Sequence, residues 1–128
     1  MSMLRAYIFR CGEAMMQGRS VNAAQKRFHD ALVRIVGCIA CRVAGRPHDI
    51  ATIHHCDGKT KPDAHYLVIP LCAVCHQLGG NGYPARHINK AEFERAYGTE
   101  QELLALSQKI LRENGYAGPM SRAGAVAQ

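Results

Sequence analysis

Two cysteine pairs place the strongest constraint on how this chain can fold. Cys38 and Cys41 form one Cys-x-x-Cys pair, and Cys72 and Cys75 form the other. Four thiolates in two such hooks match the four soft ligands of a tetrahedral zinc, which binds sulfur at about 2.3 Å. A structural zinc of this kind contributes on the order of 10 kcal/mol to folding. We therefore expect a structural Zn²⁺ to hold a small core together.

A thioredoxin-like redox motif is the competing interpretation of a Cys-x-x-Cys pair. Neither pair lies in a clear strand-to-helix element, and two pairs together suit a metal better than a redox site. The two remaining cysteines, Cys11 and Cys56, fall outside the pairs, and we expect them to be spectator thiols. Clustered reduced cysteines are typical of the cytosol, and this favours a cytoplasmic protein.

The length and composition fit one domain with tails. The chain has 128 residues, of which 48% are hydrophobic and 20% are charged, so part of it can bury a core. No apolar stretch approaches the roughly 20 residues that a membrane span requires. We expect a basic N-terminal tail over residues 1–21, a zinc-containing domain over residues 22–114, and a flexible C-terminal tail over residues 115–128.

The first half of the domain combines a helix with two strands. Asn22 is predicted to cap a helix over residues 23–36, in which apolar residues recur at three- and four-residue steps. Residues 50–56 and 65–69 are predicted to be short strands joined by a polar loop, with Pro70 closing the second strand. These elements predict an α+β fold.

The second half is predicted to be mainly helical. Residues 71–76 resemble a turn that leads into a short helix, and the glycines that follow end it. Residues 90–97 are predicted to be helical. Thr99 and Glu102 have the spacing of a capping box, which opens a helix that ends near Gly115.

Positive charge is concentrated at one end of the sequence. The net charge is +6, and residues 1–46 contain eight Lys or Arg but only two Asp or Glu. A localised positive field favours a polyanionic partner such as nucleic acid, although a solvated charged face is the alternative. The candidate phosphate contacts are Lys26, Arg27, Arg34, Lys59, Lys61 and Arg86.

Adjacent histidines close the first predicted strand. In a regular strand the side chains of His54 and His55 would point to opposite faces. Both can therefore serve one site only if the strand loses its regularity there, and the Asp57-Gly58 turn is expected to supply that break. A surface pair without function is the alternative interpretation.

The position of further histidines favours a site. His76 directly follows the second cysteine pair, and His87 follows a glycine-rich bend. Three or four imidazoles can then converge, as a hydrolytic metal site requires: some hold a cation, and another takes a proton from water. His29 is expected to be exposed. His65 is expected to be either a surface residue or a partner that orients another histidine.

At these residues the sequence resembles the HNH (ββα-metal) nucleases, in which a Cys-x-x-Cys, a strand ending in a His pair, and Leu-Cys-x-x-Cys-His follow one another. More narrowly, it resembles the phage recombination-enhancement (Ref) nucleases, which depend on RecA. The segments that carry the narrower resemblance are Gly37–Cys41, Ile53–His55, Gly58–Pro62 and Pro70–Cys72. The resemblance covers residues 22–114.

The resemblance implies a metal-dependent DNA endonuclease on a zinc-stapled ββα-metal domain, flanked by an N-terminal and a C-terminal helix. It implies that His55 is the general base and that His54, His76 and His87 hold a catalytic divalent cation. The family implies Mg²⁺ or Mn²⁺, and an all-imidazole set also accepts Zn²⁺. DNA and the RecA filament are the implied partners.

The sequence departs from these families in two places. Many HNH proteins have an Asn shortly before the second cysteine pair, where this chain has Leu67, and the N-terminal basic arm is short. Two other functions therefore stay open at this point. One is a zinc-containing module that binds nucleic acid without cutting it, and the other is a structural protein of a phage.

Overall fold

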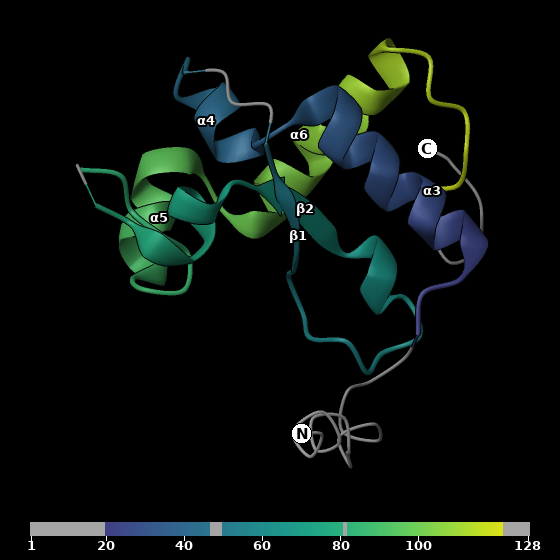
Figure 1. Ribbon diagram of the computed structural model, residues 1–128, viewed down its shortest axis with the longest axis horizontal. Helices are drawn as coiled ribbons and strands as arrows, with labels where there is room; N and C mark the ends of the chain where they lie inside the picture. Colours follow the sequence, from purple (N-terminus) through teal and green to yellow (C-terminus); the bar gives the residue numbers. More distant parts are fainter. Residues whose placement is uncertain (1–19, 47–49, 81, 122–128) are drawn as a thin grey trace, which may run out of the picture.

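A computed structural model describes residues 20–46, 50–80 and 82–121 (Figure 1). A two-stranded antiparallel hairpin lies among helices, so the α+β prediction is confirmed. In chain order the elements are α3 (Ala23–Ala31), the π-helical turn η1 (Leu32–Val36), α4 (Ile39–Val43), β1 (Thr52–His55), the 3₁₀ turn η2 (Ala64–Tyr66), β2 (Val68–Leu71), the π-helical turn η3 (Val74–Leu78), α5 (Lys90–Tyr97) and α6 (Glu100–Glu113).

Side-chain caps set where the helices begin. The Asn22 side chain accepts the backbone N–H of Gln25 at 2.8 Å, and the Gln25 side chain accepts the N–H of Asn22 at 2.9 Å. The predicted cap of α3 is therefore half of a capping box. Thr99 and Glu102 form the predicted box at the start of α6. Each box satisfies backbone donors that a helix leaves free at its first turn.

The hairpin is regular along its whole length. Thr52 lies opposite Leu71, and His55 lies opposite Val68, with no bulge between. The prediction that Pro70 closes the second strand is wrong, because β2 continues to Leu71. The Cys56 N–H bonds the carbonyl of residue 67, so alternate pairs carry the ladder bonds and Pro70 falls in a pair without them. A proline there loses no hydrogen bond.

The core packs α6 against η1, α4 and β2. All four residues of β2 are buried, and Figure 1 shows α6 crossing close to the hairpin while α5 lies to the other side. Each fully buried large apolar side chain contributes about 1.5–3 kcal/mol. Those in this cluster include Phe28, Leu32, Ile39, Ile69, Leu71, Phe93, Leu103 and Leu111. This core supports the hairpin that carries the histidines.

The chain returns to the core after α6. Met120 is buried, and the Tyr116 ring lies 6.3 Å from that of Phe28. The Tyr116 hydroxyl also donates to the Pro119 carbonyl at 3.0 Å. Packing in this segment therefore differs from the flexible tail predicted from residue 115 onward. The predicted tail residues 1–19 and 122–128 lie outside the described residues. Within those that are described, every helix is too short or too polar to span a membrane.

Candidate metal centres and active site

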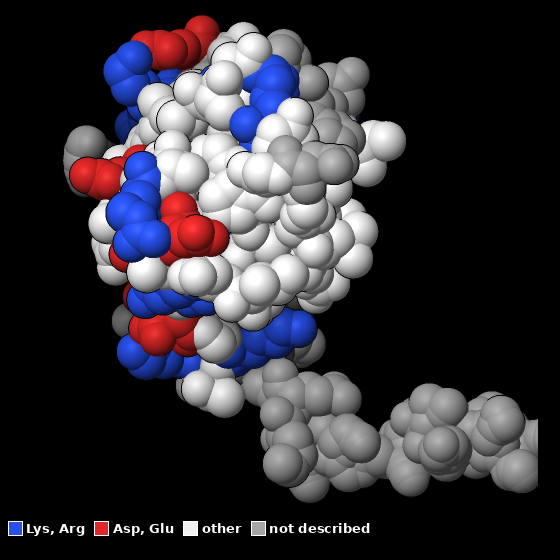
Figure 2. Space-filling view, turned by 90° about the vertical axis from the view of Figure 1, so that its left-hand side faces the viewer, with Lys and Arg blue, Asp and Glu red and all other residues white. Residues whose placement is uncertain are grey.

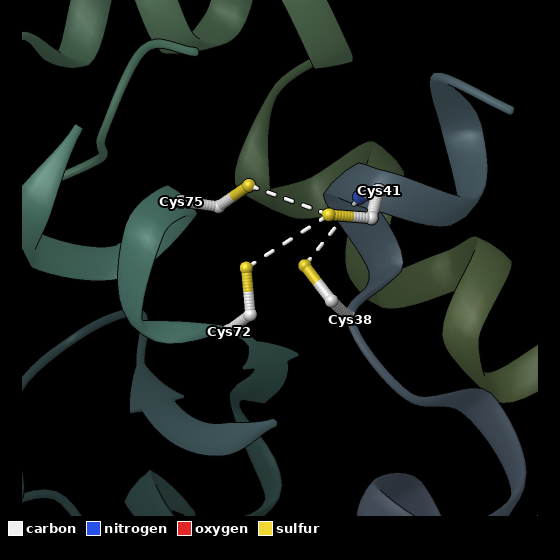
Figure 3. Close-up of side chains that lie close together, drawn as sticks. All are labelled: Cys38, Cys41, Cys72 and Cys75. Atoms are coloured by element: carbon white, nitrogen blue, oxygen red, sulfur yellow. Dashed lines mark hydrogen bonds between the residues drawn. The ribbon is translucent and has the colours of Figure 1, made fainter. Parts of the chain in front are cut away.

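The four paired cysteines meet in the core (Figure 3). The Cys38 sulfur caps α4 by accepting the N–H of Cys41 at 3.4 Å, and all four side chains are buried. The Cys41 sulfur lies 3.8 Å from those of Cys72 and Cys75. A tetrahedron with metal–sulfur bonds of about 2.3 Å has sulfur–sulfur edges of about 3.8 Å. The four residues could therefore hold a zinc ion.

An arginine balances the charge of this cysteine group. The Arg46 Nη2 donates to the Cys75 sulfur at 3.6 Å and to the Tyr97 hydroxyl, and the guanidinium lies 3.9 Å from the Tyr83 ring centroid. Burial, and then the charge of its sulfur neighbours, raises the pKa of Cys41 to about 11. Four thiolates at this place therefore require a cation, and zinc together with Arg46 can supply it.

Three histidines meet beside the hairpin. The ring centroids are 5.0 Å apart for His54 and His76, 5.2 Å for His54 and His87, and 4.8 Å for His76 and His87. Their nearest ring nitrogens all lie within 4.8 Å of one another. His54 is buried, His76 is half-buried and His87 is exposed. The group is therefore open to solvent on one side, as a catalytic metal site requires.

Hydrogen bonds aim two of these imidazoles at a common point. The Thr52 hydroxyl donates to the Leu71 carbonyl at 3.1 Å, so its oxygen can accept the Nδ1–H of His76 at 3.4 Å. His76 Nε2 then carries a lone pair, 3.3 Å from His54 Nδ1. A tetrahedral ion with bonds of about 2.05 Å separates two nitrogens by about 3.3 Å. The histidine group therefore fits a divalent cation.

Burial keeps His76 in the form that binds metal. Burial, and then the charges of the nearby His54 and His87 rings, lower the pKa of His76 to about 4. Burial also lowers the pKa of His87. Both rings are therefore neutral at physiological pH, and a neutral imidazole is the species that ligates metal.

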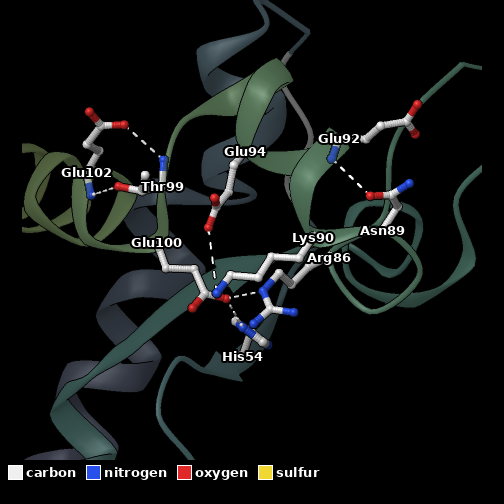
Figure 4. A network of polar contacts seen from close by, with 9 residues as sticks. All are labelled: His54, Arg86, Asn89, Lys90, Glu92, Glu94, Thr99, Glu100 and Glu102. Atoms are coloured by element: carbon white, nitrogen blue, oxygen red, sulfur yellow. Dashed lines mark hydrogen bonds and ion pairs between the residues drawn. The ribbon is translucent and has the colours of Figure 1, made fainter.

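A buried carboxylate completes this group (Figure 4). Glu100, the first residue of α6, accepts from His54 Nε2 at 2.6 Å and from the Arg86 guanidinium. The sequence interpretation missed Glu100, because an acidic residue in the first turn of a helix is explained by the helix dipole alone. Cys56 could join His54 and Glu100 in a second ligand group, which differs from the spectator role expected for its thiol.

His55 points away from the group formed by His54, His76 and His87. The prediction that the strand loses its regularity at His54 and His55 is wrong, since β1 keeps its register through His55 and the turn begins after it. The four histidines therefore form no single cluster. His55 instead places its Nε2 2.9 Å from Nδ1 of His65, with the His29 ring at 6.0 Å.

His65 and His29 form the surroundings of His55. His65 lies in η2 and is 3% exposed, so it is neither in a strand nor on the surface. His29 is half-buried rather than exposed, and its Nε2 donates to the His65 carbonyl at 2.7 Å. Burial, followed by the charges of His65 and Lys59, lowers the pKa of His55 to about 4. The His55 ring is therefore neutral and able to accept a proton at neutral pH.

The candidate phosphate contacts differ in whether they form ion pairs with carboxylates. Lys26 pairs with Asp30 at 3.5 Å, Lys61 pairs with Asp57 at 2.5 Å, and the Arg86 side chain, 19% exposed, pairs with Glu100. In the part of the chain that the structure describes, Arg27, Arg34 and Lys59 form no ion pair.

The view in Figure 2 shows how charge lies on one face of the molecule. Basic and acidic side chains lie next to one another mainly along the left of this view, and a broad uncharged area lies beside them. Exposed ion pairs of this kind contribute little stability and remain available for exchange with other charges. This face therefore presents no continuous basic surface.

A comparison with protein-family models decides the family. The model described as recombination enhancement, RecA-dependent nuclease matches residues 21–112, which include α3 and most of α6. The chain belongs to this family. It is thus a nuclease of recombination enhancement, and the resemblance to the recombination-enhancement nucleases found in the sequence is confirmed. The match includes both groups of candidate metal ligands.

Proposed function

We propose that this family member is an HNH-type, metal-dependent DNA endonuclease. The observation that carries the proposal is the arrangement around β1: His54 meets His76 and His87 on one side, while the next residue, His55, meets His65 on the other. Successive strand residues point to opposite faces. We propose that one phosphodiester lies across the end of β1, where these two adjacent residues are, with the cation on one side of the phosphate and the base on the other. The two imidazoles would then act on one substrate from opposite faces, without the break in the strand that the sequence analysis expected to be necessary.

The histidine group would hold the divalent cation, which we propose to be Mg²⁺ or Mn²⁺, with Zn²⁺ also accepted by imidazoles. When bound, the cation would stabilise the charge that develops on the phosphate and on the leaving 3′ oxygen. The buried cysteines Cys38, Cys41, Cys72 and Cys75 would hold the structural zinc. The two centres would thus divide the work, with one supporting the fold and the other supporting the chemistry.

His55 would take the proton from the attacking water. When its Nε2–H donates to His65 Nδ1, its own Nδ1 is left unprotonated and free to accept. His65 would then orient His55, the proposed base. The sequence had left open which residue orients His55, because this chain has Leu67 where many HNH proteins have an Asn. His29 would hold His65 in turn through the backbone carbonyl of that residue.

The exposed cations Arg27, Arg34 and Lys59 would contact phosphates and position the DNA without reading its sequence. Lys26 and Lys61 would join them by exchanging their exposed carboxylate partners for phosphates. Arg86 would have to leave a buried carboxylate to do the same. The RecA filament is the proposed protein partner, because the family description names a dependence on RecA.

The replacement His55→Ala tests the proposal. General-base catalysis contributes about 10² to 10⁴ in rate, so nicking of plasmid and of single-stranded DNA with Mg²⁺ or Mn²⁺, with and without RecA filament, should fall by that factor. DNA binding, measured separately, should stay unchanged. His65→Ala should lower the rate by about 10²-fold, since misplacing a catalytic group costs about that much. Gln77→Ala, an exposed change beside His76, is the control.

Two results would contradict the proposal. One is a wild-type protein that binds DNA but nicks neither substrate under any of these conditions, as expected of a module that binds without cutting. The other is a His55→Ala protein with full nicking activity, which would show that the base is elsewhere.

A further inference from the structure

The Glu100 carboxylate is buried where a charge is costly. Its side chain is 7% exposed, and it accepts hydrogen bonds from β1, through His54, and from the segment between η3 and α5, through Arg86 (Figure 4). A buried carboxylate persists only when such partners compensate for its loss of water. Nothing in the cap of α6 requires it, because Thr99 and Glu102 already form the box.

Glu100 decides which nitrogen of His54 carries the proton. The Arg86 guanidinium, which is always protonated, donates to the same oxygen of Glu100 and holds this group as a carboxylate. An ionised carboxylate can only accept. The Nε2 of His54 must therefore donate, and its Nδ1 is the nitrogen with a free lone pair, 3.3 Å from Nε2 of His76.

We propose that Glu100 is a positioning residue that fixes the tautomer and ring orientation of His54 for metal binding. Carboxylates that accept the second N–H of a ligating histidine act in this way in metal sites. The inference rests on the proposed function, in which His54, His76 and His87 hold a cation. Arg86 pairs with the carboxylate and keeps it on His54.

The backbone ties Arg86 to the metal-facing histidines. The Arg86 N–H donates to the carbonyl of Cys75 at 2.8 Å, and the His87 N–H donates to the carbonyl of His76 at 3.0 Å. Arg86, which pairs with Glu100, thus belongs to the same hydrogen-bonded segment as two of the proposed ligands, His76 and His87. A change at Glu100 should therefore alter the ligand geometry rather than the fold.

A different role for Glu100 would be to bind the metal itself, together with His54 and Cys56. That arrangement would require His54 Nε2 to lose the proton that it donates to Glu100. The existing hydrogen bonds therefore favour positioning over ligation. The replacement Cys56→Ser separates the two roles, because it weakens metal binding only if Cys56 is a ligand.

The experiment measures Mn²⁺ binding without DNA. Full-length protein with zinc in its cysteine site is titrated with Mn²⁺, and free Mn²⁺ is followed by electron paramagnetic resonance. Glu100→Ala should weaken binding by about 10- to 100-fold. Glu100→Gln should weaken it less, because an amide oxygen still accepts the Nε2–H bond. The control Glu113→Gln, at the exposed far end of α6, and Cys56→Ser should both bind as the wild type does.

A second measurement reports on His54 directly. Nitrogen-15 spectra of the zinc-loaded protein before Mn²⁺ is added should show the Nε2–H tautomer of His54 in the wild type and a mixture of tautomers in Glu100→Ala. Glu100→Gln should keep mainly the Nε2–H tautomer, because its amide oxygen still accepts that bond, and its weaker Mn²⁺ binding tests the inference should the alanine variant fail to fold.

The two failures can be told apart. A wild-type protein that binds no Mn²⁺ would overturn the metal site of the proposed function and this inference with it. A wild type that binds Mn²⁺ no more tightly than Glu100→Ala and Glu100→Gln do, with an unchanged tautomer, would overturn this inference alone. Weaker binding in Cys56→Ser would overturn it in favour of direct ligation.

Discussion

The cysteine group and the histidine group are neighbours in the chain but opposite in character. All four cysteines are buried, whereas the histidines grade from buried His54 to exposed His87. Cys75 and His76 are adjacent residues and belong one to each group. A closed set of four ligands suits a structural metal, and an open set of three suits a reacting one. One short turn thus serves both purposes.

The histidine group should depend on the cysteine group for its geometry, but the cysteine group should not depend on the histidine side chains. The carbonyls of Cys75 and His76 accept the N–H groups of Arg86 and His87, so the turn that carries Cys75 also positions the second side of the histidine group. In the other direction the His76 N–H donates to the Cys72 carbonyl at 2.9 Å, but this bond is made by the backbone and does not depend on the imidazole. The predictions below test this asymmetry.

The largest effect on stability should come from removing a ligand of the cysteine group. Cys72→Ser removes one of four zinc ligands, and a structural zinc contributes about 10 kcal/mol or more of apparent folding energy, which equals or exceeds the stability of most small domains. The variant should lose zinc, lose its cooperative melting transition by circular dichroism, and bind no Mn²⁺. His76→Ala is the matched comparison, and it should keep both zinc and the melting transition. A Cys72→Ser protein that melts as the wild type does would contradict the asymmetry.

A smaller effect should distinguish the buried member of the histidine group, His54, from its exposed member, His87. His54→Ala should abolish Mn²⁺ binding and also lower the free energy of unfolding by about 1–3 kcal/mol, because the buried Glu100 carboxylate loses a donor. His87→Ala should weaken Mn²⁺ binding while changing the free energy of unfolding by no more than about 0.5 kcal/mol, since the side chain is exposed. Urea denaturation measures both values. Equal destabilisation by the two changes would show that burial does not distinguish these ligands.

The smallest effect concerns pH and the far side of the hairpin. Burial lowers the pKa of His29 below its ordinary value of 6.5, so as pH falls below about 6.5 the unfolded chain takes up a proton that the folded chain does not. Stability is therefore fully present above this pH and decreases as pH falls toward the folded-state pKa. His29→Gln should reduce the slope of melting temperature against pH between 6.5 and 5. An unchanged slope would assign the pH dependence to other groups.

Local signals in the sequence predicted much of the fold. The caps at Asn22 and Thr99 were predictable because each depends on residues within one helical turn. The bounds of α5 were also predicted from the local sequence. The cysteine group was predictable because a metal imposes its own spacing on the chain. Each of these features is decided by neighbours in sequence or by one chemical requirement.

The candidate site was predicted less completely, because it depends on tertiary contacts. Glu100 lies 46 residues from His54, and no motif joins the two. The separation of His54 from His55 follows from the alternation of a regular strand, but we expected a break there since convergence of all the histidines required one. The ladder bond from Cys56 to the carbonyl of residue 67 keeps the strand regular past both residues. His65 reaches His55 because η2 turns its ring inward, which the strand pattern did not indicate.

The strict alternation of β1 limits how this protein can vary in length. Residues 57–62, at the end of the hairpin, are mostly exposed, and extra residues there would lengthen the loop without moving either group of imidazoles. A single residue inserted between Thr52 and His55 would instead turn every following side chain to the opposite face. Insertions should therefore accumulate in related chains at the tip of the hairpin and be absent from the four residues of β1.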